Sequence, residues 1–472
     1  MKAVIMAGGY GMRLRPLTCD LPKPMVPLVN QPILLHVLNL LKKYQFNEIG
    51  MLLYYYPEII RDYFSDGSKF GMKIKYFSPQ GDLGTAGSVK FAEEELKKTF
   101  LVISGDLVTD FDLEKALEFH CERKALATIV LTRVANPLQY GVVITGDGGG
   151  IIRFLEKPSW GEVFSDTINA GIYILEPEIF SYIPEDTEFD FSKNLYPLIL
   201  EKGLPLYGYI AEGYWRDIGD LEEYRLAHYD CLERLAELNI SGREMKTSKS
   251  SGIVDEGTKI KSNVEFISPV IIGKNCHIDE NVELGRTVIG NNVTIGKGSK
   301  LYGCIVWDDA VIGEEVEAKE TILGRKAKVD SRATLDVGVV VSDGCGIGKE
   351  AVVRANVKIW PLKRVEPGAV LSTSLVWGER WTKTLFTTYG ITGLTNIEIT
   401  PEFATKVGAA FGAFLGKGAY VLTSRDAHPA SRMIKRTMIS GLLSAGVKVG
   451  DLRTAPIPLV RYQLGREGEA GG

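Results

Sequence analysis

Residues 7–18 read A-G-G-Y-G-M-R-L-R-P-L-T, and the string P-K-P follows at residues 22–24. The apolar run Lys2–Ala7 comes directly before this segment and predicts a β-strand. Glycines just after a strand let backbone N–H groups approach phosphate oxygens, because no Cβ stands in the way. Two cations, Arg13 and Lys23, accompany the loop. The segment therefore predicts a site for a polyphosphate, such as a nucleoside triphosphate, at the carboxyl end of the first strand.

The rest of residues 1–235 alternates short apolar runs with amphipathic stretches. This alternation predicts an α/β fold with a mainly parallel sheet that helices cover. Ligands bind such sheets at the carboxyl ends of the strands, so chemistry is expected in the loops that follow them. The predicted elements are strands at Lys2–Ala7, Glu48–Tyr55, Phe100–Ser104, Ala125–Arg133 and Ile168–Leu175, and helices at Pro32–Tyr44 and Leu113–Lys124.

A different pattern starts after a predicted helix, Gly219–Asn239, and a predicted polar linker, Ser241–Lys261. Aliphatic residues then recur at a six-residue spacing, and glycine often follows them, as in I-G-K-N and I-G-N-N. This period fits neither an α-helix nor one amphipathic strand, and it predicts a parallel β-helix whose aliphatic side chains point into a narrow prism. The repeat includes Ile272, Ile278, Leu284, Ile289, Ile295, Leu301, Ile347, Val353 and Ile359.

The six-residue period is lost again from about Trp381. Thr400 before Pro401 predicts the start of a helix, because threonine caps helices and proline suits their first position. A strand, a helix and a further strand are predicted at Ala419–Thr423, Ala430–Ala445 and Val447–Leu452. The predicted organisation is an α/β domain at 1–235, a helix end and linker at 236–262, a β-helix domain at 263–377 and an incomplete α/β domain at 378–472.

Composition narrows the choice of partners. The 55 basic and 59 acidic residues give a net charge of −4, which disfavours a nucleic-acid partner. No run of about 18 uncharged apolar residues occurs, so we expect no membrane partner. The six cysteines include no C-x-x-C pair, which indicates reduced thiols and a cytoplasmic location.

The glycine segment resembles the signature of the sugar-1-phosphate nucleotidyltransferases, G-G-x-G-x-R-L-x-P-L-T followed by P-K-P, at every specified position. The resemblance covers most of residues 1–235. It implies a Rossmann-like domain with a mixed, mainly parallel sheet, which transfers a nucleotidyl group from a nucleoside triphosphate to a sugar-1-phosphate and releases pyrophosphate. The nucleotide contacts that it implies are Ala7, Gly8, Gly9 and Gly11, and, within Q-G-D-L-G-T-A-G at residues 80–87, Gln80, Leu83, Gly84 and Thr85.

The same resemblance implies a Mg²⁺ cofactor held by Asp106 and Asp217, in the strings S-G-D and W-R-D-I-G. Magnesium prefers one or two carboxylates plus substrate phosphates, so two separated aspartates suffice. Arg13 and Lys23 complete the implied catalytic set. The sugar phosphate is expected at Glu156 and Lys157 of the E-K-P element, and at Gly141, Asn169 and Gly171.

The string L-G-T-A-G resembles that of guanylyltransferases, which favours GTP and mannose-1-phosphate as substrates. Two alternatives stay open. One is a uridylyl- or thymidylyltransferase for glucose-1-phosphate. The other is a regulatory, non-catalytic homologue that binds nucleotide sugar.

The two remaining regions also resemble known families. The hexapeptide region is similar to the left-handed β-helix behind many of these catalytic domains, and we expect it to drive homo-oligomer formation. The strings I-T-P-E-F-A at residues 399–404 and S-R-D-A-H-P-A-S-R at 424–432 resemble the start of a phosphoglucomutase/phosphomannomutase. The mutase family's phosphoserine string T-A-S-H-N-P does not occur, so we expect no mutase activity.

Overall fold

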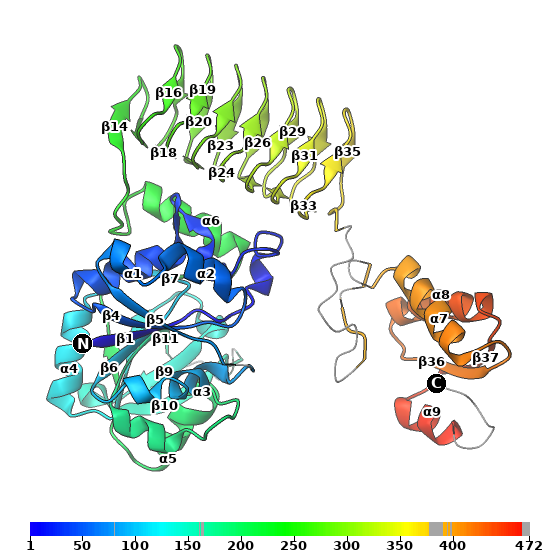
Figure 1. Cartoon of the computed structure of the whole chain (residues 1–472), viewed down its shortest axis with the longest axis horizontal. Coiled ribbons are helices and arrows are strands. Elements are labelled where there is room, and N and C mark those ends of the chain that lie inside the picture. Colours follow the sequence, from blue (N-terminus) through cyan, green and yellow to red (C-terminus); the bar gives the residue numbers. More distant parts are fainter. Residues whose placement is uncertain are drawn as a thin grey trace. The chain divides into compact units, whose positions relative to one another are not determined.

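A computed structural model of the protein describes residues 1–79, 81–159, 161, 165–376, 390–393, 395–396 and 399–464 (Figure 1). The chain divides into two compact units, Met1–Leu375 and Val376–Gly472. No helix of the described ranges is long and apolar enough to cross a membrane.

The first unit begins with the predicted α/β fold. Its main sheet has the order β10-β9-β11-β6-β1-β4-β5, and β8 joins it through β11 and carries β12. Strands β1, β4, β5 and β6 are parallel, whereas β11 runs antiparallel to β6. The strands are β1 (Lys2–Met6), β4 (Glu48–Leu52), β5 (Lys73–Phe77), β6 (Phe100–Ser104), β8 (Ala127–Arg133), β9 (Gly141–Thr145), β10 (Ile151–Glu156), β11 (Thr167–Leu175) and β12 (Leu206–Ile210).

Helices cover this sheet, so the centre of β1 is fully buried on both faces, as central parallel strands are. The helices are α1 (Ile33–Lys43), α2 (Pro57–Phe64), α3 (Gly84–Lys90), α4 (Leu113–Arg123), α5 (Tyr196–Glu201) and α6 (Leu221–Leu232). Helix α6 is shorter than the predicted Gly219–Asn239. Asp220 caps its first turn, and Arg234 adopts a left-handed backbone conformation (φ 58°) that ends it.

The predicted β-helix follows as a stack of short coils, coloured green to yellow in Figure 1. Each complete coil adds one strand to each of three sheets in the described chain, and coil-to-coil pairing is parallel. The repeat residues predicted to point inward, such as Ile272, Ile289 and Val353, are fully buried.

The first sheet contains β14 (Arg243–Lys246), β15 (Ser251–Val254), β18 (Val270–Ile272), β21 (Thr287–Ile289), β24 (Ile305–Val306), β27 (Ile322–Leu323), β30 (Val340–Val341) and β33 (Lys358–Ile359). The second contains β16 (Lys259–Ile260), β19 (His277–Ile278), β22 (Thr294–Ile295), β25 (Val311–Ile312), β28 (Lys328–Val329), β31 (Gly346–Ile347) and β34 (Arg364–Val365). The third contains β17 (Glu265–Phe266), β20 (Glu283–Gly285), β23 (Lys300–Tyr302), β26 (Glu317–Lys319), β29 (Thr334–Leu335), β32 (Val352–Val353) and β35 (Val370–Leu371).

The predicted linker Ser241–Lys261 is wrong in part, because strands β14, β15 and β16 lie within it. β15 pairs in parallel with β18, and Val254 is buried in the β-helix core. A strand of a coil needs only one or two apolar residues to fill the interior of the β-helix. The many serines and lysines around those residues therefore made the stretch look like a polar linker.

His228 of α6 leads to a prediction about acid stability. Its ring is buried and packs edge-on against Tyr224 at 4.7 Å. Burial, with nearby His36, lowers the pKa of His228 from 6.5 to about 3. The unfolded chain therefore binds a proton that the folded chain excludes once the pH falls below about 6.5, so acid lowers the free energy of unfolding.

We expect His228 to cost about 2 kcal/mol of stability between about pH 7.5 and about pH 5. The substitution His228→Phe removes this titration and keeps an aromatic ring against Tyr224. Thermal unfolding of the full chain at both pH values checks the prediction. The midpoint should fall less in the variant than in the wild type, and an equal fall in both would contradict the prediction.

The second unit has the predicted α/β pattern, with parallel strands β36 (Tyr420–Arg425) and β37 (Lys448–Thr454). Thr400 caps the first helix as predicted, since its hydroxyl accepts a hydrogen bond from the Phe403 N–H at 3.2 Å. The predicted boundary near Trp381 lies outside the described residues. The helices are α7 (Pro401–Leu415), α8 (Pro429–Ser444) and α9 (Ile457–Gln463).

Candidate active site

The glycine loop leaves β1 and packs directly against Lys23. Gly11 has a left-handed backbone (φ 61°), and a Cβ placed there would lie 2.9 Å from the Lys23 Cβ. Short 3-10 helices follow at η1 (Met12–Leu14) and η2 (Lys23–Met25), which carry the two predicted cations. The glycine is therefore required both by its backbone conformation and by the closeness of Lys23.

Lys23 lies between the two predicted metal ligands. Its ammonium forms an ion pair with Asp106 and lies 3.5 Å from Asp217 Oδ1. Strands β7 (Leu107–Thr109) and β13 (Trp215–Asp217) bring the carboxylates together, because their antiparallel pairing places Asp217 opposite Leu107. Residues 111 positions apart in the sequence thus meet around one cation.

The charges of Lys23, Asp106, Asp217 and Arg13 act strongly on one another. Burial alone would lower the pKa of Lys23, but the carboxylates of Asp106 and Asp217 outweigh burial and raise it, so the lysine stays charged. Burial and the neighbouring Asp106 raise the pKa of the Asp217 carboxyl, although Lys23 and Arg13 oppose them. Arg13 also lies close by, since a Cβ at Gly219 would be 3.1 Å from its guanidinium. The structure thus brings all four predicted catalytic residues together.

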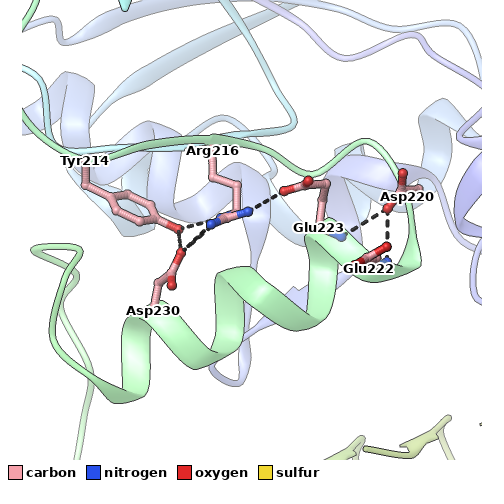
Figure 2. A network of polar contacts seen from close by, with 6 residues as sticks. All are labelled: Tyr214, Arg216, Asp220, Glu222, Glu223 and Asp230. Atoms are coloured by element: carbon pink, nitrogen blue, oxygen red, sulfur yellow. Dashed lines mark hydrogen bonds and ion pairs between the residues drawn. The ribbon is translucent and has the colours of Figure 1, made fainter. Parts of the chain in front are cut away.

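A polar network fixes the strand that carries Asp217 (Figure 2). The Arg216 guanidinium donates to Asp230 Oδ2 at 2.9 Å and to Glu223, both on α6. The Tyr214 hydroxyl donates to the same Asp230 oxygen at 2.8 Å. Tyr214 and Arg216 thus anchor this stretch of chain to Asp230 and Glu223 of α6. Asp217, the next residue, therefore has little freedom to move away from Asp106.

Two further aspartates near the site, Asp220 and Asp110, have structural roles. Asp220 Oδ1 accepts hydrogen bonds from the N–H groups of Glu222 and Glu223, both at 3.0 Å, and so caps α6 (Figure 2). Asp110 Oδ1 accepts from the Tyr214 N–H at 2.7 Å and thereby ties two loops together.

The residues predicted for the sugar phosphate lie on β9, β10 and β11, except Lys157, which directly follows β10. Glu156 pairs with Gly141 across β10 and β9, and a Cβ at Gly141 would be 2.9 Å from the Glu156 carboxylate. The Lys157 N–H donates to the Tyr140 carbonyl at 3.1 Å, and the Tyr140 ring contacts the Trp215 ring edge-on at 5.5 Å. Tyr140 and Trp215 therefore link this group to the strand of Asp217.

Asn169 and Gly171 join the same site through β11. A Cβ at Gly171 (φ 75°) would be 3.1 Å from Ser104 Oγ, beside the S-G-D string. The Asn169 side chain accepts from the Gly171 N–H at 2.9 Å and donates to the Tyr173 hydroxyl at 3.0 Å. The Trp215 indole donates to the Ala170 carbonyl at 2.9 Å and holds this bend against β13.

The predicted nucleotide contacts divide into two groups. Around the glycine loop, Ala7 is buried, a Cβ at Gly8 would be 3.1 Å from the Tyr54 Cβ, and Gly9 faces open space. In the second group Gln80 lies outside the described residues. The remaining members, Leu83, Gly84 and Thr85, lie at the start of α3.

The second group is braced by residues 189–191. A Cβ at Gly84 (φ 66°) would lie 2.9 Å from the Phe189 carbonyl oxygen. The Thr85 hydroxyl donates to Asp190 at 2.9 Å and accepts from the Phe191 N–H at 2.9 Å. The hydroxyl of Thr85 is thus engaged within the protein.

Sequence reasoning missed several side chains of the site. Tyr140 and Arg216 each stand next to a predicted residue, and Trp215 stands two positions before Asp217. The tryptophan before R-D-I-G was the available signal. Tyr10 was also missed. Its ring lies 5.7 Å from that of Tyr54, beside the glycine loop, and no spacing rule pointed to this pair.

The two aspartates fit a magnesium ion by the chemistry of their oxygens. No group of three or more His, Cys, Asp and Glu side chains gathers as a metal site within the described ranges. However, a single ammonium reaches both Asp106 and Asp217, so the two carboxylates converge on one point. Two carboxylates completed by phosphate oxygens form a suitable set of Mg²⁺ ligands.

Comparisons with known proteins agree with this site. Residues 2–234 match the nucleotidyl transferase family, residues 251–353 match the LbH domain of EIF2B subunit epsilon, and residues 383–472 match the alpha/beta/alpha domain I of phosphoglucomutase/phosphomannomutase. These matches confirm the predicted α/β nucleotidyltransferase fold, the β-helix and the partial mutase-like domain.

Several curated relatives align over most of their own length. The chain is 34% identical over 360 residues to a UTP–glucose-1-phosphate uridylyltransferase of Synechocystis sp., which covers 73% of this chain and 92% of the relative. It is 30% identical over 318 residues to a mannose-1-phosphate guanylyltransferase of Mycobacterium tuberculosis, and the alignment covers 67% of this chain and 81% of the relative. It is 32% identical over 367 residues to a mannose-1-phosphate guanyltransferase of Kluyveromyces lactis, and the alignment covers 72% of this chain and 98% of the relative.

The chain therefore belongs to the sugar-1-phosphate nucleotidyltransferases. It is an enzyme that transfers a nucleotidyl group to a sugar-1-phosphate, as the glycine signature predicted. Enzymes of this family generally use a divalent metal ion.

Proposed function

We propose that this enzyme transfers guanylate from GTP to mannose-1-phosphate with the help of Mg²⁺, releasing pyrophosphate. The observation that carries the proposal is the cluster of Lys23, Asp106 and Asp217, with Arg13 beside it, at the carboxyl ends of the central strands. This is the arrangement that charge neutralisation in phosphoryl chemistry requires.

The reaction is an in-line displacement. An oxygen of the sugar-1-phosphate attacks the α-phosphorus of the triphosphate and forms a new P–O bond. The bond from the α-phosphorus to the bridging oxygen breaks, and that oxygen leaves with pyrophosphate. The nucleophile is already an anion, so no side-chain nucleophile is needed, and the protein contributes positioning and charge.

The proposed roles follow from the positions of the residues. N–H groups of Gly8, Gly9 and Gly11 approach the phosphates, while Arg13 and Lys23 neutralise the charge that develops on the departing pyrophosphate. Glu156 binds sugar hydroxyls and Lys157 pairs with the sugar's phosphate. Gly141 and Gly171 allow close backbone approach at the floor of the sugar site. Asn169 shapes the same floor, because its side chain accepts a hydrogen bond from the Gly171 N–H.

Asp106 and Asp217 would hold the Mg²⁺ ion, which supplies a Lewis acid for the phosphate oxygens. The Lys23 ammonium lies between these carboxylates, so it would have to leave them for both to hold the ion. The flexible stem of lysine allows this ammonium to reach the triphosphate instead. Lys23 thus has two alternative partners, the carboxylates before binding and phosphate oxygens afterwards.

The choice of GTP and mannose-1-phosphate is supported by L-G-T-A-G at residues 83–87 and by the names of two of the relatives above. The uridylyltransferase of Synechocystis favours a second candidate, transfer from UTP to glucose-1-phosphate. A thymidylyltransferase and a non-catalytic regulatory homologue are further alternatives.

Pyrophosphate release with Mg²⁺ over a panel of nucleoside triphosphates and sugar-1-phosphates separates these candidates. We expect GTP with mannose-1-phosphate to exceed every other pair in kcat/KM. A preference for UTP or dTTP with glucose-1-phosphate would replace the base and sugar assignment. No release with any pair would favour the regulatory homologue.

The wider setting is also part of the proposal. We infer a cytoplasmic protein with reduced thiols, because the six cysteines of the sequence include no C-x-x-C pair. The β-helix is proposed to support a homo-oligomer, and no nucleic-acid or membrane partner is proposed. We propose 1–235, 236–262, 263–377 and 378–472 as the functional division of the chain, with strands β14, β15 and β16 of the second stretch counted with the β-helix.

A further inference from the structure

The β-helix has an apolar stripe on its outer face. Ile271, Val288, Ile305, Ile322 and Val340 occupy the same position on successive coils, one residue before an inward-pointing side chain. All five are buried, and they belong to the same apolar core as residues of the glycine segment and of α6. The nucleotidyltransferase domain and the β-helix therefore share one core.

Two side chains beside this stripe stand out in the repeat. The position after the inward-pointing residue is glycine in three of these five coils, at Gly273, Gly290 and Gly324. In the other two it is Trp307 and Ser342. Both are buried, with 2% and 1% of their surface exposed.

These two side chains donate hydrogen bonds that lead to the backbone of Pro16 and Pro27, before and after Lys23 in the sequence. The Ser342 hydroxyl donates to the Pro16 carbonyl at 2.8 Å. The Trp307 indole donates to the Tyr224 hydroxyl at 2.9 Å, and that hydroxyl donates to the Pro27 carbonyl at 2.6 Å. The β-helix thus reaches the backbone on either side of Lys23.

A third contact holds the tight turn at the end of the segment Pro16–Asn30, which contains Lys23. Strands β2 (Pro27–Leu28) and β3 (Gln31–Pro32) form a hairpin whose turn residues, Val29 and Asn30, have φ of 41° and 69°. Valine in this left-handed region is strained, and such strain persists only where the surroundings hold it. The Asn30 amide donates to the Ile289 carbonyl of β21 at 2.7 Å, which fixes the turn against a coil.

We propose that the β-helix takes part in the transfer reaction, with Ser342 and Trp307 as positioning residues for the segment Pro16–Asn30 and hence for Lys23. This inference rests on the proposed function, because it assigns Lys23 its place beside the phosphates. Loss of the two donors should loosen the segment while leaving the residues that touch substrate unchanged. Small displacements of groups that stabilise the transition state lower kcat strongly.

The test uses the full chain with Ser342→Ala and Trp307→Phe combined. Each substitution removes a donor. Ser342→Ala keeps nearly the same volume, and Trp307→Phe keeps an aromatic ring but loses the pyrrole part of the indole. The matched control is Ser299→Ala, because Ser299 is equally buried and donates at 2.8 Å to the Gly313 carbonyl within the β-helix. We expect kcat of the double variant to fall about 10-fold or more, with both KM values changed less than about 3-fold. The control should lose thermal stability but keep its kcat.

Hydrogen exchange gives a readout that does not depend on turnover. Peptides that cover residues 16–32 should exchange faster in the double variant than in the wild type or in Ser299→Ala. A double variant with wild-type kcat would overturn the inference and leave the proposed function standing. A wild-type chain without any activity would overturn the proposed function, and unchanged exchange of residues 16–32 would then overturn the positioning role as well.

Discussion

Replacing Asp217 by alanine is expected to lower kcat by about 100-fold or more, the size of effect seen when a main electrostatic stabiliser is lost. The carboxylate converges with Asp106 on one cation, and the Arg216 network holds it there. Alanine removes one of the two proposed Mg²⁺ ligands and leaves Lys23 with Asp106 alone. Steady-state pyrophosphate release at saturating Mg²⁺ measures the loss.

A structural aspartate provides the control for this variant. Asp112 caps α4 by accepting hydrogen bonds from the N–H groups of Glu114 and Lys115 at 3.1 and 3.2 Å. Asp112→Ala should cost about 1 kcal/mol of stability, as cap losses do, and keep kcat within about 2-fold. Near-normal turnover of Asp217→Ala would show that the carboxylate is not part of the catalytic set.

Replacing Lys23 by methionine should lower kcat/KM for the triphosphate by about 100-fold. Methionine keeps much of the stem and removes the charge, so the phosphates lose a partner that strengthens as negative charge develops. Lys23→Arg should recover only part of the activity, because a planar guanidinium does not replace a compact ammonium. The surface pair Lys43–Glu237, with N and O atoms 3.7 Å apart, supplies the control Lys43→Met. That control should keep wild-type kinetics.

The same variant tests the competition between Lys23 and the metal without any turnover. In the absence of substrate the ammonium occupies the space between Asp106 and Asp217. Lys23→Met should therefore bind Mg²⁺ more tightly than the wild type in calorimetric titration, and added Mg²⁺ should raise its thermal midpoint more. Weaker metal binding by the variant would contradict the proposed exchange of partners.

Much of the site could be predicted because its residues stand in short strings at the ends of strands. Arg13, Lys23, Asp106 and Asp217 were all predicted, and the structure brings them into one cluster. The phosphate-binding role of the glycine loop could be predicted because glycines after a strand let backbone N–H groups approach phosphates. The structure adds that Lys23 packs on Gly11, where a Cβ would have no room. The six-residue period likewise predicted the β-helix, because each coil must place an aliphatic side chain inside the prism.

What could not be predicted depends on contacts between distant residues. The β7–β13 pair is three residues long and has no periodicity, yet it joins Asp106 to Asp217. The Thr85 hydroxyl bonds to a carboxylate 105 residues further on, which no local string reveals. In the sequence, Ser342 and Trp307 differ only in replacing the glycine found at the same position of other coils. Their hydrogen bonds, which lead to the carbonyls of Pro16 and Pro27, are visible only in the folded structure.

The central claim is that the α-phosphate of the nucleotide is transferred to a sugar-1-phosphate. Incubation with GTP labelled at its α-phosphate, mannose-1-phosphate and Mg²⁺ tests it most directly. The label should appear in a nucleotide sugar, in an amount equal to the pyrophosphate released, and only when all three components are present. Label that remains in GTP, or that is released as a free nucleotide without a sugar product, would contradict the claim.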